Sequence, residues 1–306
     1  MKICITGGLG YIGRHLVENL CKQGHDVIVI YKNSYGKLLP VLTERYANLS
    51  IHITDLFDME LVPFFYDNQI ETVIHLASET NNPELNVLSL GAHVWTAAAM
   101  TCSVNRFINI SDIGNSDLNY EGCRKEPLDY IGSKRALEYR IAKYMDNDTK
   151  TFNVRIDSVY GHSHSLPFSD HKKSLWFDLV NCVNTGDTLN LPTSTGDERG
   201  TVTNDWINIF DVVEIISKFA THSTHYYERT PHWVIGIGEG CTAYNFTRIF
   251  NTIEDVAVQI NFVPNTSQDI IGHACDPRRA FKYLDFRSKV GPRIYSNSYL
   301  NGVYLT

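Results

Sequence analysis

The sequence has little that points to a membrane or to a disulfide framework. No uninterrupted apolar stretch approaches the roughly 20 residues that span a bilayer, and the first residues lack the apolar core of a signal peptide. The seven cysteines are odd in number and scattered, without a C-x-x-C pair, so neither structural disulfides nor a zinc site is expected. We therefore expect a cytoplasmic protein with free thiols and no bound metal.

An excess of positive charge is also missing. Lys and Arg total 27 against 34 Asp and Glu, which gives a formal net charge of −7, and no basic block is present that would follow a phosphate backbone. Hydrophobic residues make up 43% of the chain, a composition with which 306 residues bury a substantial core. We expect a globular protein whose partner is neither nucleic acid nor a membrane.

Short apolar segments alternate with stretches of helical spacing along the first half of the chain. Residues 2–6 read KICIT, a glycine-rich turn follows, and residues 11–23 carry apolar side chains at helical spacing. DVIVIY at 26–31 is apolar through its centre, as strands buried on both faces of a parallel sheet are. Similar segments lie near residues 51, 74, 108 and 153. The alternation predicts an α/β fold with a Rossmann-type, doubly wound parallel sheet.

This pattern changes after Gly161, where loops rich in His, Ser, Pro and Asp replace the alternation. Later segments mix strands and helices in no fixed order. We predict a dinucleotide-binding domain over 1–161, which regains sheet segments at about 203–238, and a smaller, interleaved α/β substrate lobe over 162–202 and 239–306.

Glycines stand at 7, 10 and 13 in TGGLGYIG, between the first strand and the first helix. The first permits a tight turn, the second lets the backbone approach a pyrophosphate, and the third lets helix and strand pack closely. The N-terminus of the helix then faces the anion. This placement predicts dinucleotide binding by Gly7, Gly10, Tyr11, Ile12 and Gly13.

The end of the second strand distinguishes NAD from NADP. A carboxylate there accepts a hydrogen bond from the ribose 2′-hydroxyl of NAD, but IYKNS at 30–34 contains none. Lys32 and Asn33 stand in its place, which favours NADP. NAD is the alternative, with Lys32 an ordinary solvated lysine.

Further cofactor contacts are expected at the ends of the third and fourth strands. Asp55 suits either an adenine amine or a helix cap. The others are Leu56, Leu76 and Ala77.

Tyr130 and Lys134 are four residues apart in PLDYIGSKRALE, so a helix places both on one face. A nearby ammonium favours the phenolate and lowers the tyrosine pKa from about 10, which makes the hydroxyl a usable proton donor or acceptor at neutral pH. The alternative is two ordinary residues on a helix surface.

Together with TGGLGYIG, this spacing resembles the extended short-chain dehydrogenase/reductase family, which includes nucleotide-sugar epimerases, dehydratases and reductases. The resemblance covers nearly the whole chain, in VIHLA at 73–77, FINIS at 107–111, YIGSKRALE with Glu138 in register, VRIDSVYG at 154–161, NDWINIFDVV at 204–213 and VIGIGEG at 234–240. It implies that Tyr130 is the general acid and base and that Lys134 holds the nicotinamide ribose.

The sequence departs from this family at the third catalytic position. Members usually carry Ser or Thr after the serine that ends the fifth strand, then a V-Y-G turn, whereas this chain reads ISDIGN at 110–115. Either a protonated Asp112 donates to the substrate oxygen, or Ser111 supplies the hydroxyl through a shifted loop. We favour Ser111, because an ionised Asp112 beside Tyr130 would raise the tyrosine pKa.

The resemblance implies an NAD(P)-dependent oxidoreductase that acts at C4 of a nucleotide-activated sugar, and a homodimer. NADP favours reduction of a 4-keto sugar, because net reduction needs an external hydride pool. A 4-epimerase, which recycles its bound cofactor, is the alternative, and an inactive cofactor-binding regulatory subunit is the alternative of another class. Arg199 and Arg278 are candidates to bind the substrate diphosphate, because the guanidinium fork suits it. An ordinary surface position is at least as well expected for both.

Overall fold

The computed structural model describes residues 1–32, 38–78, 89–113, 130–143, 149–161, 175–193, 203–222, 232–264, 275–276 and 278–288. The chain divides into two compact units. Met1–Arg155 and Val213–Trp233 make up the first, and Ile156–Val212 with Val234–Thr306 the second. None of the helices in the described ranges has both the length and the apolar character needed to cross a membrane.

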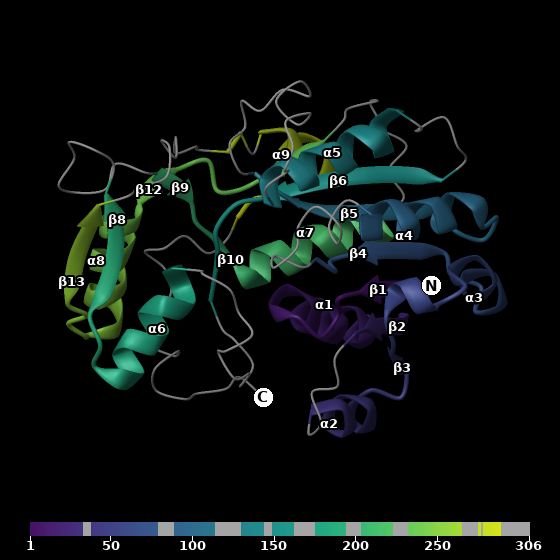
Figure 1. Ribbon diagram of the computed structural model, residues 1–306, viewed down its shortest axis with the longest axis horizontal. Coiled ribbons are helices and arrows are strands. Elements are labelled where there is room, and N and C mark those ends of the chain that lie inside the picture. Colours follow the sequence, from purple (N-terminus) through teal and green to yellow (C-terminus); the bar gives the residue numbers. More distant parts are fainter. Residues whose placement is uncertain are drawn as a thin grey trace. The chain divides into compact units, whose positions relative to one another are not determined.

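The first unit is built on a parallel sheet of seven strands in the order β11-β6-β5-β4-β1-β2-β3. Figure 1 labels the strands from β6 to β3. The chain runs outward from β1 to β3 and then returns past β1 to β4, so its direction reverses between these two central strands. This confirms the predicted Rossmann-type, doubly wound α/β sheet. The strands are β1 (Lys2–Thr6), β2 (Asp26–Tyr31), β3 (Leu49–Ile53), β4 (Thr72–His75), β5 (Arg106–Asp112), β6 (Lys150–Ile156) and β11 (Trp233–Ile235), of which β6 up to Arg155 and only Trp233 of β11 belong to this unit.

Helices cover both faces of this sheet. The connection from β1 to β2 runs in one direction and those from β4 to β6 in the other, so right-handed crossovers place α1 on the face opposite α4 and α5. The helical segments are α1 (Tyr11–Lys22), α2 (Leu38–Arg45), the 3₁₀ helix η1 (Leu56–Asp58), α3 (Leu61–Asp67), α4 (Ser89–Met100), α5 (Tyr130–Lys143) and α7 (Ile209–Thr221), of which the part from Val213 belongs to this unit.

The main apolar cluster lies between the sheet and helices α3, α4 and α5. Cys4, Val73 and Phe107 are neighbours in register on β1, β4 and β5, and each is fully buried. They belong to one cluster with Leu137 and Ile141 of α5. The face of the sheet on which these side chains lie is therefore the face that α5 covers.

Two strand ends differ from the sequence prediction. The strand expected at 73–77 already ends at His75, because the backbone N–H of Ala77 has turned toward the side chain of Thr6, 3.5 Å away. The strand expected at 107–111 extends to Asp112, so this aspartate is the last residue of β5 and not part of the following turn.

The second unit contains short strand pairs and helices. β10 (Ile207–Asn208) pairs in parallel with β7 (Val159–Tyr160), and β13 (Ile260–Pro264) pairs in parallel with β8 (Leu189–Thr193). β12 (Gly240–Thr242) pairs antiparallel with β9 (Thr203–Asp205). Its helices include α6 (Leu175–Thr185), α8 (Ala243–Glu254) and α9 (Arg278–Leu284).

A fully buried carboxylate joins three segments of this second unit. Asp205 accepts hydrogen bonds from the backbone N–H groups of Ile237 (2.7 Å), Gly238 (2.8 Å) and Cys275 (2.9 Å). Burial and the nearby carboxylates of Asp205 and Asp157 raise the pKa of the Cys275 thiol, which is therefore neutral at pH 7.

Candidate functional site

The glycine turn between β1 and α1 fits a dinucleotide pyrophosphate. Gly7 has a φ of +72°, a conformation that favours glycine, and a Cβ at this position would lie 2.7 Å from the backbone N of Ala77. A Cβ at Gly13 would lie 2.6 Å from the carbonyl oxygen of Gly7, so this glycine allows the close approach of helix and turn. Gly10 is the N-cap of α1, whose first turn has no acidic side chain. The positive end of the helix is thus suited to an anion.

The end of β4 lies against this turn. The backbone N–H of Leu76 donates to the carbonyl oxygen of Thr6 at 3.0 Å, and Ala77 is the residue that a side chain at Gly7 would strike. Tyr11 and Ile12 are half-buried in the first turn of α1. The structure therefore brings together the predicted cofactor residues Gly7, Gly10, Tyr11, Ile12, Gly13, Leu76 and Ala77.

The ends of β2 and β3 meet in an ion pair. Lys32 Nζ lies 3.0 Å from Asp55 Oδ2. Asp55 is also the N-cap of η1, where its side chain accepts a hydrogen bond from the backbone N–H of Phe57 at 3.0 Å. That backbone hydrogen bond and then Lys32 lower the pKa of Asp55. Of the two predicted roles for Asp55, the structure shows helix capping, while the side chain of the adjacent Leu56 packs in the core.

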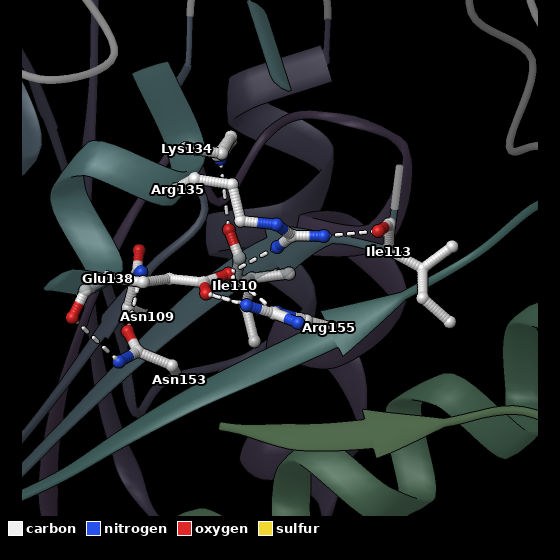
Figure 2. A network of polar contacts seen from close by, with 8 residues as sticks. All are labelled: Asn109, Ile110, Ile113, Lys134, Arg135, Glu138, Asn153 and Arg155. Carbon is white, nitrogen blue, oxygen red and sulfur yellow. Dashed lines mark hydrogen bonds and ion pairs between the residues drawn. The ribbon is translucent and has the colours of Figure 1, made fainter. Parts of the chain in front are cut away.

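Two consecutive cationic residues of α5 hold the end of β5 (Figure 2). Lys134 Nζ donates to the carbonyl oxygen of Ile110 at 2.9 Å, and the Arg135 guanidinium donates to the carbonyl oxygen of Ile113. Both side chains are buried. Ser111 and Asp112 lie between the two carbonyl groups, so the backbone of this dipeptide is anchored to α5 on either side.

Ser111 lies on the face of the sheet that α5 covers. Side chains alternate along a strand, so Ser111 shares this face with Phe107, which packs in the core with Leu137 of α5. Its side chain is buried, and its Oγ has no hydrogen-bond partner among the described residues. Leaving such a hydroxyl without a partner costs about 1–3 kcal/mol, which makes this atom a candidate for contact with a ligand.

A buried network continues from Arg135 to β6 (Figure 2). Glu138 accepts from Arg135 Nη1 at 2.8 Å and from Arg155 Nη2 at 2.6 Å. Asn153 of β6 donates to the carbonyl oxygen of Glu138 at 3.4 Å and accepts from Asn109 of β5 at 2.9 Å. The network fixes α5 on both strands. Burial lowers the pKa of Arg135, against the carboxylates of Glu138 and Asp112, which raise it.

A neutral histidine lies beside the glycine turn and is close enough to Lys134 for its charge to affect the histidine pKa. His75 Nδ1 lies 2.7 Å from Thr6 Oγ1, immediately before Gly7. Burial, and then the charge of Lys134, lower the pKa of His75 to about 3, so its imidazole is uncharged at pH 7. Roles for Thr6, His75 and Arg135 were not predicted from the sequence. Their positions in the sequence could have indicated them, since Thr6 and His75 end adjacent central strands and Arg135 follows Lys134.

Four predicted site residues remain, Asn33, Tyr130, Arg199 and Arg278. Tyr130 begins α5 four residues before Lys134, as expected, but its side chain lies outside the described residues, as do Asn33 and Arg199. Arg278 belongs to the second unit, where its side chain is 88% exposed and forms an ion pair with Asp276 at 2.6 Å. This geometry is that of a surface arginine.

Comparisons with known proteins agree with this arrangement. A family model described as the NAD dependent epimerase/dehydratase family matches residues 3–236. UDP-glucose 4-epimerase of Bacillus subtilis is 24% identical over 95% of this chain and 93% of its own length. CDP-abequose synthase of Yersinia pseudotuberculosis is 23% identical over 89% of this chain and 88% of its own.

Solved structures show the same fold. A UDP-glucose 4-epimerase of Thermotoga maritima, solved with UDP-glucose, has a TM-score of 0.80 at 20% identity and covers 99% of both chains. A UDP-glucuronic acid 4-epimerase of Bacillus cereus, in complex with UDP-glucuronic acid and NAD, has a TM-score of 0.76 at 19% identity and covers 99% of this chain and 100% of its own. At this identity the likeness establishes the architecture alone.

Proposed function

This chain belongs to the NAD-dependent epimerase/dehydratase family, and on that premise we propose that it transfers hydride at C4 of a nucleotide-activated sugar, as a 4-epimerase with bound NAD. The observation that carries the proposal is the end of β5. There the Lys134 ammonium is buried against the carbonyl group of Ile110, and the next residue, Ser111, presents a buried hydroxyl with no partner among the described residues. A cation, a hydroxyl and the first residue of α5, Tyr130, supply the groups that such chemistry needs.

The residues of the glycine turn suit the cofactor. Gly7, Gly10 and Gly13 leave the start of α1 open to a pyrophosphate, and His75, which is hydrogen-bonded to Thr6 just before this turn, lies within the electrostatic influence of Lys134. A bound nicotinamide supplies the hydride acceptor. Lys134 would hold its ribose and lower the pKa of Tyr130.

Proton transfer belongs to the side chains of this protein. Tyr130 would take the proton of the sugar C4 hydroxyl as hydride leaves C4, and would return it when hydride comes back. Ser111 would donate a hydrogen bond to the C4 oxygen and hold it in place. Inversion at C4 is redox-neutral overall, so a 4-epimerase with bound NAD would need no external reductant.

The Lys32–Asp55 ion pair supports NAD in place of the NADP predicted from the sequence. Asp55 lies 3.0 Å from the Lys32 ammonium and offsets part of the charge with which Lys32 would attract a 2′-phosphate. Two acidic partners, a carboxylate and a phosphate, would then compete for one cation. Several solved relatives of this fold hold NAD, among them the Bacillus cereus epimerase.

A second candidate function is reduction of a 4-keto nucleotide sugar with NADPH. The observation that favours it is the end of β2, where Tyr31 and Lys32 stand and no carboxylate of that strand is available for a ribose 2′-hydroxyl. Mass spectrometry of the small molecules released from the denatured protein separates the two candidates. Retained NAD supports the epimerase, and NADP or an empty site supports the reductase.

Tyr130→Phe tests the proposed activity itself. Cofactor affinity should stay nearly intact while turnover falls by a factor on the order of 10² to 10⁴, the contribution of a positioned acid and base. Turnover is measured as interconversion of C4 epimers of UDP-hexoses and UDP-hexuronic acids, with single-turnover reduction of 4-keto nucleotide sugars beside it. A wild-type protein that binds cofactor and converts none of these sugars would be a cofactor-binding regulatory subunit.

A further inference from the structure

Glu138 does not need Arg135 to balance its charge, so the burial of Arg135 requires another explanation. The carboxylate of Glu138 already has a cationic partner in Arg155, at 2.6 Å, and the carboxylate and both guanidinium groups of this network are largely shielded from water. One carboxylate therefore meets two guanidinium groups, and arginine keeps its proton in proteins. A second buried cation without its own carboxylate is costly to desolvate, so its presence calls for a further contact.

That contact is the backbone at the end of β5. One amino group of Arg135 binds Glu138, and the other binds the carbonyl oxygen of Ile113 (Figure 2). Lys134, one residue earlier on α5, binds the carbonyl oxygen of Ile110. The half-buried Asp112 lies between these carbonyls and supplies the negative charge that partly offsets Arg135.

We propose that Arg135 is a positioning residue: with Lys134 it forms a two-point clamp that fixes the Ile110–Ile113 segment on α5 and so sets the place of the Ser111 hydroxyl. Lys134 alone would fix the segment at one carbonyl, and Ile113, the first residue after β5, would have no anchor on α5. The guanidinium fork suits the second point, because it reaches a carboxylate and a carbonyl at once. The consequence for turnover rests on the proposed function, whereas the clamp itself does not.

If Arg135 forms this clamp, Arg135→Met should lower turnover and leave the melting temperature nearly unchanged. Loss of Arg135 leaves the balanced Glu138–Arg155 pair, so the melting temperature should stay within about 3 °C of wild type. Turnover should fall by roughly 10- to 100-fold, since a misplaced donor costs catalysis far more than binding. KM and the cofactor dissociation constant should change by less than about threefold, because uniform binding is retained.

Two further variants complete the experiment. Arg135→Lys keeps the charge and loses the fork, so it should lose turnover as Arg135→Met does. Arg140→Met makes the same change at an exposed position of α5 and is the matched control. Full turnover in Arg135→Lys would mean that charge alone matters, and a melting temperature that falls in step with turnover would reduce Arg135 to a structural residue; either result overturns the clamp.

Hydrogen exchange keeps the test independent of activity. In the cofactor-free protein, backbone amides around residues 111–113 should exchange faster in Arg135→Met than in wild type or Arg140→Met, because one anchor of that segment is gone. Unchanged exchange would refute the clamp even in an active enzyme. Faster exchange in a protein that converts no nucleotide sugar would support the clamp and refute the proposed function.

Discussion

At the scale of single residues, the proposed chemistry depends on whether Ser111 or Asp112 donates a hydrogen bond to the sugar oxygen. Ser111 is buried and lies on the α5 face of the sheet, whereas Asp112 is half-buried and its carboxylate acts on Arg135. An ionised carboxylate accepts hydrogen bonds and donates none, whereas a hydroxyl does both. The hydroxyl is therefore the better donor.

Paired substitutions separate these two residues. Ser111→Ala should reduce turnover by a factor on the order of 10² to 10³, the loss expected for one donor to a developing oxyanion. Asp112→Asn should reduce turnover less and should lower the melting temperature, because it removes the charge that offsets Arg135. Initial rates and thermal melts of both variants provide the measurement. A larger loss of turnover at 112 than at 111 would instead assign the donor to a protonated aspartate.

At the scale of secondary-structure elements, the three glycines of the β1–α1 turn are not equivalent. Side chains at Gly7 or Gly13 would strike backbone atoms at 2.6–2.7 Å, so variants there test folding and not binding. A Cβ at Gly10 has a single close neighbour, the carbonyl oxygen of Gly7 at 3.3 Å. Gly10 is thus the position at which the anion site can be altered in a folded protein.

Gly10→Asp should abolish dinucleotide binding, because it places a negative charge at the positive end of α1 where the pyrophosphate is expected. Gly10→Ala makes the same backbone change without the charge and should retain weakened binding. Calorimetric titration with NAD and NADP, beside a thermal melt that confirms folding, checks both variants. Equal affinities in Gly10→Asp and wild type would remove the cofactor from this turn.

Elements with a strong local pattern were predictable from the sequence. KICIT and DVIVIY became strands with the expected bounds, because a short run of apolar residues next to a glycine turn has few other uses in an α/β chain. The spacing of Tyr130 and Lys134 likewise placed both on α5. These features depend on neighbours in sequence.

Features that depend on residues far apart in sequence were not predictable. The pairing of Lys32 with Asp55 joins two strand ends, and it changes the meaning of a lysine that alone suggested NADP. The shared carboxylate of Glu138 joins α5 to β6 and shows why an arginine follows Lys134. Periodicity contains no information about such contacts, since they arise from sheet register and helix rotation.

At the scale of the whole molecule, the buried neutral His75 couples stability to pH. Its pKa is about 3 in the folded protein against 6.5 for an unperturbed histidine. Between these values the unfolded chain binds a proton that the folded protein excludes, so the free energy of unfolding falls as pH drops from about 6.5 toward 3. The stability that results from excluding this proton is fully present above about pH 6.5 and is lost progressively below it.

Comparison with His75→Asn isolates this contribution. From pH 7 to pH 5, wild type should lose about 2 kcal/mol more than the variant, since each pH unit below 6.5 costs about 1.4 kcal/mol. Urea unfolding at the two pH values measures the difference. Parallel losses would mean that His75 is protonated in the folded state or that other groups dominate acid unfolding.

The discontinuity of the first unit has a consequence for biosynthesis. β11, at the edge of the sheet beside β6, is contributed by residues 233–235, and helix α7 supplies Ser217, which accepts a hydrogen bond from Asn19 of α1 at 2.8 Å. A ribosome delivers the chain from its N-terminus, so β6 emerges some 80 residues before its outer neighbour. During that interval the nascent sheet has an unpaired edge of polar backbone groups, the kind of edge that joins other chains. Protection of this edge by a chaperone, or a pause in translation beyond residue 235, would therefore influence the yield of folded protein. Its influence on the thermodynamic stability of the finished sheet would be smaller.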